Sequence, residues 1–371
     1  MAAPDDVPAT ITGPTASDCL AQAQRHLSEG RLREAQALGE RAQQLTRRSA
    51  DLRGEAAAVL LMAQAELMGS NVRQAWRSSR GAAQLFRRAS DEAGEARALA
   101  LNANACSTLG HGEEALEVAL RSTALADRSG DLRLRVLCHN YLSVALMWNA
   151  DFDAADAAFE RTCALAAGLG DDLTARWQPL GNRCTSELFR QFGRRHLQGE
   201  AISLERLEQL LEPARALGPL RQGAMLNGAS PVIAMLIAEW LEGFAACWSG
   251  RLEPARRHLQ RSFERVRQLR YSPWLHATVM WLRSEIAWAA GQWDEASQAA
   301  NEMIAIATLV ESESLAVRGH ELAAQVYAAQ GLHHQAVDEL MALRRREQAI
   351  RAESLSHRKQ VLQESLVLSS R

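Results

Sequence analysis

The chain has 371 residues, of which 47% are hydrophobic and 23% are charged, a composition typical of a globular protein and not of a disordered one. Its formal net charge of -2 provides no overall attraction to nucleic acid or to an anionic membrane, so we expect neither partner. The first residues, MAAPDDVPATITGPT, contain no basic segment followed by an apolar run, so we expect no signal peptide and a cytoplasmic protein.

In chain order, the pattern predicts a tail and then a series of paired helices. Residues 1–15 are rich in Pro, Thr and Asp and are expected to be disordered. Beyond them, apolar residues recur at helical spacing between Gly, Asn and Asp turn signals. The expected helix pairs are 16–29 and 31–49, 52–69 and 71–89, 92–109 and 111–129, 131–148 and 151–168, 232–249 and 252–270, 273–290 and 293–311, and 314–330 with 333 onward.

A repeat with a period of about forty residues runs through these pairs. A small residue in the first helix is followed twelve positions later by alanine in the second, which lets the two helices approach closely. Such a period is typical of a solenoid. The paired positions are Ala23/Ala35, Ala63/Ala75, Ala103/Ala115, Ser143/Ala155, Gly243/Ala255, Ser284/Ala296 and Ala324/Ala336.

The period breaks once, in an expanded irregular unit at about residues 171–230. Helices are expected at 173–192 and 200–217, followed by a long loop to Pro231. The basic stretch with Arg190, Arg194, Arg195 and His196 is expected to be a solvated loop, or alternatively to contact an acidic partner. Long loops in a compact fold are often functional.

The last helix contains no Pro or Gly from His333 to Leu368, so it is expected to be long. We predict a helical extension or linker at residues 350–371 beyond the repeats. Its apolar residues, Leu355 and Leu362 among them, fall at heptad-like spacing and predict a weak homodimer through this helix.

The spacing of the small residue and the alanine resembles the tetratricopeptide-repeat (TPR) family over about residues 16–349. The resemblance implies an all-α, right-handed α-solenoid of TPR-like helix pairs with a long C-terminal helix. The repeat departs from the usual 34 residues and lacks the family's aromatic residue four places before the small one. The segment from Arg358 to Leu366 resembles the linker that joins such repeats to a diguanylate cyclase in some bacterial proteins, although the catalytic GGDEF motif is absent.

No motif for chemistry emerges from the sequence. The six cysteines have no CxxC spacing, and the H-E-x-x-H match that starts at His320 has Ala324 in place of the second histidine. No glycine-rich phosphate loop follows a strand. We therefore expect no enzyme activity, no cofactor and no metal site.

The resemblance implies that the first helices of successive units line a concave groove. Amides in the N-terminal half are suited to hydrogen-bonding a peptide backbone, and aromatic residues concentrate in the C-terminal half. The alternative is that the aromatic stripe is core between units. The groove candidates are Gln64, Asn104, Asn140, Trp148, Trp240, Phe244, Trp248, Trp281, Glu285, Trp288 and Gln325.

Three functions compete. The favoured one is a non-catalytic protein-interaction or sensory-regulatory scaffold that binds a peptide or protein partner in the groove. The second is a small-molecule-sensing TPR module that regulates a diguanylate cyclase or another signalling output. An enzyme is kept only formally, because no nucleophile and base are paired in the sequence.

Overall fold

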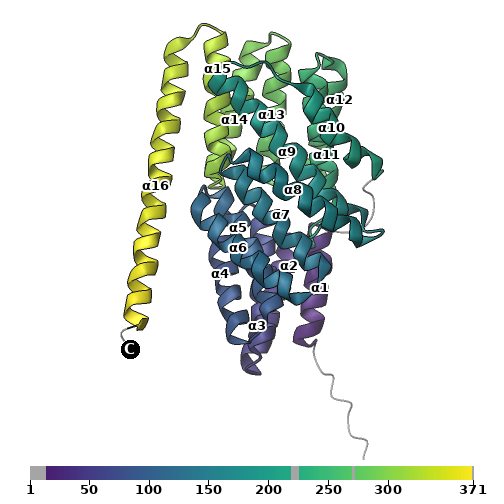
Figure 1. Cartoon of the computed structure of the whole chain (residues 1–371), viewed down its shortest axis with the longest axis vertical. Helices are drawn as coiled ribbons and strands as arrows, with labels where there is room; N and C mark the ends of the chain where they lie inside the picture. Colours follow the sequence, from purple (N-terminus) through teal and green to yellow (C-terminus); the bar gives the residue numbers. More distant parts are fainter. Residues whose placement is uncertain (1–13, 219–224, 270–271, 370–371) are drawn as a thin grey trace, which may run out of the picture.

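The computed structural model describes residues 14–218, 225–269 and 272–369, and within these ranges the chain forms helices and no strand (Figure 1). The predicted all-α solenoid is confirmed. Most of the expected tail, residues 1–13, lies outside the described part of the chain. The first four pairs are α1 (Ala16–Ser28) and α2 (Leu32–Arg48), α3 (Leu52–Met68) and α4 (Val72–Arg88), α5 (Glu92–Thr108) and α6 (Gly112–Ser129), and α7 (Leu132–Trp148) and α8 (Phe152–Ala166).

The irregular unit differs most from its prediction. After a short 3-10 helix (Ala167–Leu169), α9 (Leu173–Gln198) continues through the basic stretch that was expected to follow it, and α10 (Leu204–Ala216) comes next. Residues 219–224 of the expected loop lie outside the described residues. The remaining helices are α11 (Pro231–Trp248), α12 (Leu252–Gln268), α13 (Pro273–Ala289), α14 (Trp293–Leu309), α15 (Glu313–Ala329) and α16 (His333–Ser369).

The paired small residues of successive units, here called the small-residue columns, lie where the two helices of each pair touch. Every paired residue is buried, Ser143 and Ala155 completely. The Ser284 hydroxyl donates to the carbonyl oxygen of Ala296 at 2.8 Å, so the side chain of one column reaches the backbone of the other. At Gly243 an added Cβ would lie 3.3 Å from the Cβ of His258 on the paired helix α12. The columns therefore determine how closely paired helices approach.

Polar caps and tight turns separate the helices. Asp51 and Asp91 accept the backbone N–H of Gly54 and Gly94 in the first turns of α3 and α5, as expected for N-caps. Between α3 and α4 the turn residue is Ser70, which has a φ of +63°. Glycine would adopt this backbone with less strain. The Ser70 hydroxyl instead accepts the backbone N–H of Trp274, at the start of α13, at 3.2 Å.

The superhelix closes on itself, because the ends of the N-terminal units meet the starts of the C-terminal ones. Besides the contact of Ser70 with α13, the Ser314 hydroxyl at the start of α15 donates to the carbonyl oxygen of Ser107 near the end of α5. Arg73 pairs with Glu311 at 2.6 Å. The contact from Ser70 also satisfies a backbone N–H that the start of α13 leaves open. The concave side is consequently enclosed.

The C-terminal helix α16 runs unbroken past residue 350, so no break in structure marks the expected boundary between repeats and extension. It runs along one side of the body (Figure 1) and contacts the N-terminal units. Ile350 lies beside Gly110, and Glu353 pairs with Arg73 at 2.6 Å. The side chains from residue 357 onward, including Leu362, lie outside the described residues.

Helix α11 is long and apolar enough to cross a membrane by length and composition. Half of this helix is nevertheless buried within the fold, and Trp240 and Phe244 on it are almost inaccessible. A helix in the core of a folded domain can be equally long and apolar. The sequence contained no uninterrupted apolar run of that length because Glu239 and Glu242 interrupt it.

Enlarging a small-residue position should destabilise the fold. Ala103 and Ala115 are completely buried against each other's helices, so Ala103→Leu and Ala115→Leu are each expected to lower the free energy of unfolding by about 1–3 kcal/mol. Ala124→Leu, at an exposed position of α6, is the matched control. Urea unfolding measures all three. Equal stability of the three variants would contradict the assigned packing positions.

Candidate functional site

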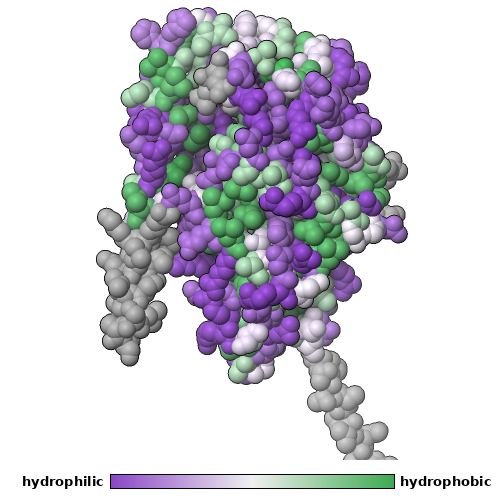
Figure 2. Space-filling view, in the orientation of Figure 1, coloured by the Kyte–Doolittle hydropathy of each residue, from purple (hydrophilic) through white to green (hydrophobic). Residues whose placement is uncertain are grey.

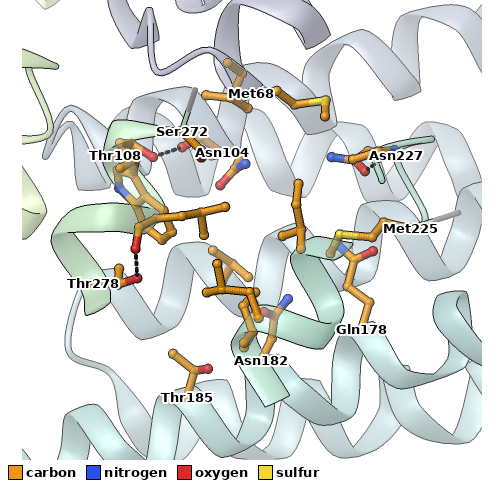
Figure 3. Close-up of a pocket in the computed structure, with 18 of the residues that line it drawn as sticks. Met68, Asn104, Thr108, Gln178, Asn182, Thr185, Met225, Asn227, Ser272 and Thr278 are labelled. Atoms are coloured by element: carbon orange, nitrogen blue, oxygen red, sulfur yellow. Dashed lines mark hydrogen bonds between the residues drawn. The ribbon is translucent and has the colours of Figure 1, made fainter. Parts of the chain in front are cut away.

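The concave side contains a partly open cavity of about 210 Å³ (Figure 3). It is formed mainly by the first helices of the pairs, α3, α5, α7, α11, α13 and α15, together with α9, as the resemblance implied for a groove. Its apolar wall includes Leu67, Met68, Val144, Met147, Trp148, Phe189, Ile233, Ile237, Trp240 and Trp274. Its polar groups include Asn104, Thr108, Gln178, Asn182, Thr185, Asn227, Ser272 and Thr278.

Two side-chain amides that face the cavity differ in their hydrogen bonding. The side chain of Asn104, on α5, is half-buried and forms no hydrogen bond with the residues that the structure describes. The amide nitrogen of Asn182 donates to the side-chain oxygen of Asn140 at 3.1 Å. Asn140 is completely buried, and its own side-chain nitrogen has no partner within the described ranges. Asn104 is therefore an amide whose side-chain donor and acceptor are both open to a ligand.

The wall beside Asn227 belongs to the irregular unit. The Asn227 amide nitrogen donates to the Tyr141 hydroxyl oxygen at 3.1 Å. Burial raises the pKa of Tyr141 to about 12, although the hydrogen bond from Asn227 acts in the opposite direction. The phenol consequently stays neutral and serves as a hydrogen-bonding group. The Gln64 amide, a predicted groove residue, donates to the Asn227 carbonyl oxygen at 3.1 Å.

The C-terminal half of the predicted groove is occupied by α9. Phe192 lies against Trp281, with ring centroids 4.7 Å apart, and Phe189 lies 5.3 Å from the same ring. Trp281 and Phe244 are completely buried and reach no open surface. We therefore place these two candidates in the packing between units. Trp240 also packs on Trp281 but lines the cavity, and its indole N–H donates to the Thr278 carbonyl oxygen at 2.7 Å.

A buried ion pair holds the end of α9 in the groove. Arg195 binds the carboxylate of Glu285 through two nitrogens, and the Glu285 side chain is only 2% exposed. Burial lowers the pKa of Arg195, but the charge and hydrogen bonds of Glu285 outweigh it and raise the pKa overall. The guanidinium lies over the Trp288 ring at 4.6 Å, and the Trp248 indole N–H donates to Glu285 at 3.0 Å. Arg195 is thus neither a solvated residue nor free for an acidic partner.

The other two arginines of the basic stretch form ion pairs, and Gln325, the last groove candidate, lies away from the cavity. Arg190 pairs with Asp153 at 3.1 Å and donates to the Phe152 carbonyl oxygen, so it holds α9 on α8. Arg194 is half-exposed and lies 4.0 Å from Glu200. The amide atoms of Gln325, on α15, are buried without a hydrogen-bond partner among the described residues. Gln325 does not line the cavity.

Sequence reasoning missed the residues that the irregular unit brings to the cavity. Gln178, Asn182 and Asn227 belong to no repeat, so no column position selected them. Two features of the sequence point to these residues. One is the expansion of the irregular unit, and the other is the Asn227-Gly228 dipeptide within it, which is typical of a turn.

The cysteines and acidic residues are not arranged for chemistry in the described part of the chain. Burial raises the pKa of Cys138, Cys184 and Cys247 to about 12, so these thiols stay protonated. No group of three or more His, Cys, Asp or Glu side chains within the described ranges is placed to hold a metal ion. The His320 ring contacts Glu339 at 2.6 Å and Arg346 at 3.1 Å.

No protein-family model and no curated protein matches this chain. Solved structures share its fold. A Rap protein complexed with Competence and Sporulation Factor is 12% identical, with a TM-score of 0.58, over 91% of this chain and 99% of that one. The Rap conjugation gene regulator of plasmid pLS20, solved with the Phr* peptide, is 13% identical, with a TM-score of 0.53, over 89% and 99%. Aspartyl phosphate phosphatase F from Bacillus subtilis is 10% identical, with a TM-score of 0.54, over 93% and 97%.

These likenesses show the fold alone. The helix pairs are TPR-type repeats, and the likeness covers about nine-tenths of the chain. The resemblance of the last helix to a diguanylate cyclase linker stays a prediction.

Removing one partner of the buried ion pair should destabilise the chain. Arg195→Met leaves the Glu285 carboxylate buried without a cation, which is expected to lower the free energy of unfolding by about 3–5 kcal/mol. Arg194→Met removes the neighbouring, half-exposed arginine and is expected to change it by less than about 1 kcal/mol. Urea unfolding compares the two variants, and equal losses would show that the Arg195 contact is not what holds α9 in place.

Proposed function

We propose that this chain is a non-catalytic scaffold that binds a peptide, or an exposed segment of a protein partner, in the enclosed concave groove. The cavity combines an apolar wall with a few convergent amides and hydroxyls, the combination that fixes a ligand's orientation while burying its apolar surface. The related structures solved with Competence and Sporulation Factor and with the Phr* peptide support a regulatory role of this kind.

One observation carries the proposal. Gln24, Gln64 and Asn104 each follow the small residue of their unit and lie forty positions apart, so they form a row of amides along the inner helices. The first two donate to backbone carbonyl oxygens, at 3.4 and 3.1 Å. The third faces the cavity and forms no hydrogen bond with a described residue. An amide in that place is suited to the next carbonyl of a peptide backbone.

The absence of catalysis and a cytoplasmic location are parts of the same proposal. The raised pKa values of Cys138 and Cys184 keep these two thiols protonated and poorly nucleophilic. All six cysteines are free, which fits a reducing compartment.

The second candidate is a small-molecule sensor, which the mostly apolar lining of the cavity favours. A volume of about 210 Å³ holds a small apolar ligand as readily as one large side chain. A screen of metabolites by thermal shift separates the two candidates. A metabolite that raises the melting temperature of the natural chain but not of an Asn104→Leu chain would favour the sensor.

Peptide selection tests the favoured function. Peptides selected from a random display library on the natural chain are expected to bind Asn104→Leu about tenfold more weakly, because an unpaired polar group in a desolvated contact costs ~1–3 kcal/mol. The fold should survive, since the Asn104 side chain is half-buried and has no described partner to lose. Gln44→Leu, at an exposed position of α2, is the matched control. A library that yields no peptide sensitive to Asn104→Leu would contradict the proposal.

We also propose that α16 pairs with a second copy of the chain. The exposed fractions of Val337, Leu340, Met341 and Leu355 are 55, 51, 53 and 59%, and apolar patches lie among hydrophilic residues on this side of the molecule (Figure 2). The opposite face, with Ile350 and Glu353, contacts the N-terminal units. Exposed apolar rows usually mark an interface.

Charges placed in that row should prevent pairing. The double variant Met341→Asp with Leu355→Asp is expected to sediment as a monomer at micromolar concentrations at which the natural chain forms dimers. Glu347→Lys, at an intermediate position of the same helix, controls for a general effect of charge. A monomeric natural chain at these concentrations would refute the dimer.

A further inference from the structure

A short segment of the irregular unit, Met225–Ala229, lies against the groove as a bound peptide would. Its backbone groups are bound in sequence by side chains of four inner helices. Arg133 donates to the Met225 carbonyl oxygen at 3.0 Å, and the Gln178 side-chain oxygen accepts the Leu226 N–H at 2.8 Å. Gln64 then donates to the Asn227 carbonyl oxygen at 3.1 Å, and Gln24 donates to the Gly228 carbonyl oxygen at 3.4 Å.

These contacts are unusual for a connection between helices. Loop backbones ordinarily lie on the surface, where water or their own turn satisfies them. Here α7, α9, α3 and α1 each contribute one side chain to consecutive residues of the segment, and the side chains of Met225 and Asn227 form one wall of the cavity (Figure 3). The groove thus already has the residues that a peptide backbone needs.

The segment also shows which peptide shape fits. It forms a tight turn, in which the Met225 N–H donates to the Ala229 carbonyl oxygen at 3.0 Å. Gly228 has a φ of +79°, and an added Cβ would lie 2.5 Å from the Gln24 amide nitrogen. Glycine adopts this backbone without strain, whereas any other residue would be strained and would also displace the end of the Gln24 side chain. Asn227 adds a hydrogen bond from its amide to the Tyr141 hydroxyl oxygen.

We propose that Met225–Ala229 is an intrachain ligand, and that the partner of the groove is a peptide with an Asn-Gly turn that competes with this segment for Gln24, Gln64 and Gln178. The inference rests on the proposed peptide-binding function and specifies its ligand. A competing peptide that takes the place of the segment extends past it to Asn104, the third amide of the row. The tethered segment has a high effective concentration, so the natural chain binds such a peptide more weakly than a chain without the segment.

The test uses a fluorescent synthetic peptide with the sequence of residues 225–230, Met-Leu-Asn-Gly-Ala-Ser, and fluorescence anisotropy. The full chain with residues 225–229 replaced by a Gly-Ser run of equal length is expected to bind this peptide about tenfold more tightly than the natural chain. Adding Gln64→Leu to the replaced chain should abolish that gain. A peptide with valine in place of its glycine should bind each chain more weakly, because a β-branched residue adopts the positive φ of Gly228 only with strain.

A second variant keeps the inference testable if the replaced chain does not fold. Asn227→Ala removes the contact with Tyr141 and the segment's own bond to the Ala229 N–H but leaves the groove side chains in place. It is expected to bind the synthetic peptide more tightly than the natural chain. Circular dichroism and thermal melting establish that each variant is folded.

A folded variant that binds the peptide no more tightly than the natural chain overturns the inference. If library peptides still bind the natural chain in a manner sensitive to Asn104→Leu, the proposed function stands and only the intrachain ligand is rejected. If no peptide of either kind binds any of these chains, the proposed function fails as well.

Discussion

The close contact between the two helices of each pair is the constraint on which the rest of the structure depends. Columns of small residues such as Ala103 and Ala115 hold paired helices at short range, and the same geometry repeats from unit to unit. Equal steps between the regular units give those units a regular superhelical curvature. The regular units and the irregular unit together bring the end of α3 to the start of α13, where Ser70 accepts the Trp274 N–H.

Because the superhelix closes, its concave side is no longer a long open groove. In an open solenoid the first helices present a long groove, but here the irregular unit enters the same space. The end of α9 occupies the C-terminal half through Phe192 and the Arg195–Glu285 ion pair, and Met225–Ala229 lies along the amides of the N-terminal units. The cavity with the open Asn104 amide remains between them. Binding specificity is therefore expected to depend as much on the inserted unit as on the repeats.

The regular helices could be predicted because their signals are local: small residues at fixed spacing, Gly and Asn turns, and Asp caps such as Asp51. The candidate site could be predicted only where it follows the repeat. Asn104 and Trp240 line the cavity and Gln64 binds its wall, whereas Trp281 faces α9 because a helix distant in sequence packs on it. No period locates the contributions of the irregular unit, since their positions depend on how the whole superhelix closes.

The most direct test of the account is a crystal structure of the natural chain with a library-selected peptide. The account predicts that the peptide lies on the concave side, with a backbone carbonyl on the Asn104 amide and an apolar side chain in the cavity between α5, α7 and α11. A peptide bound to the outer helices or to α16, with the cavity and the Met225–Ala229 segment unchanged, would contradict it.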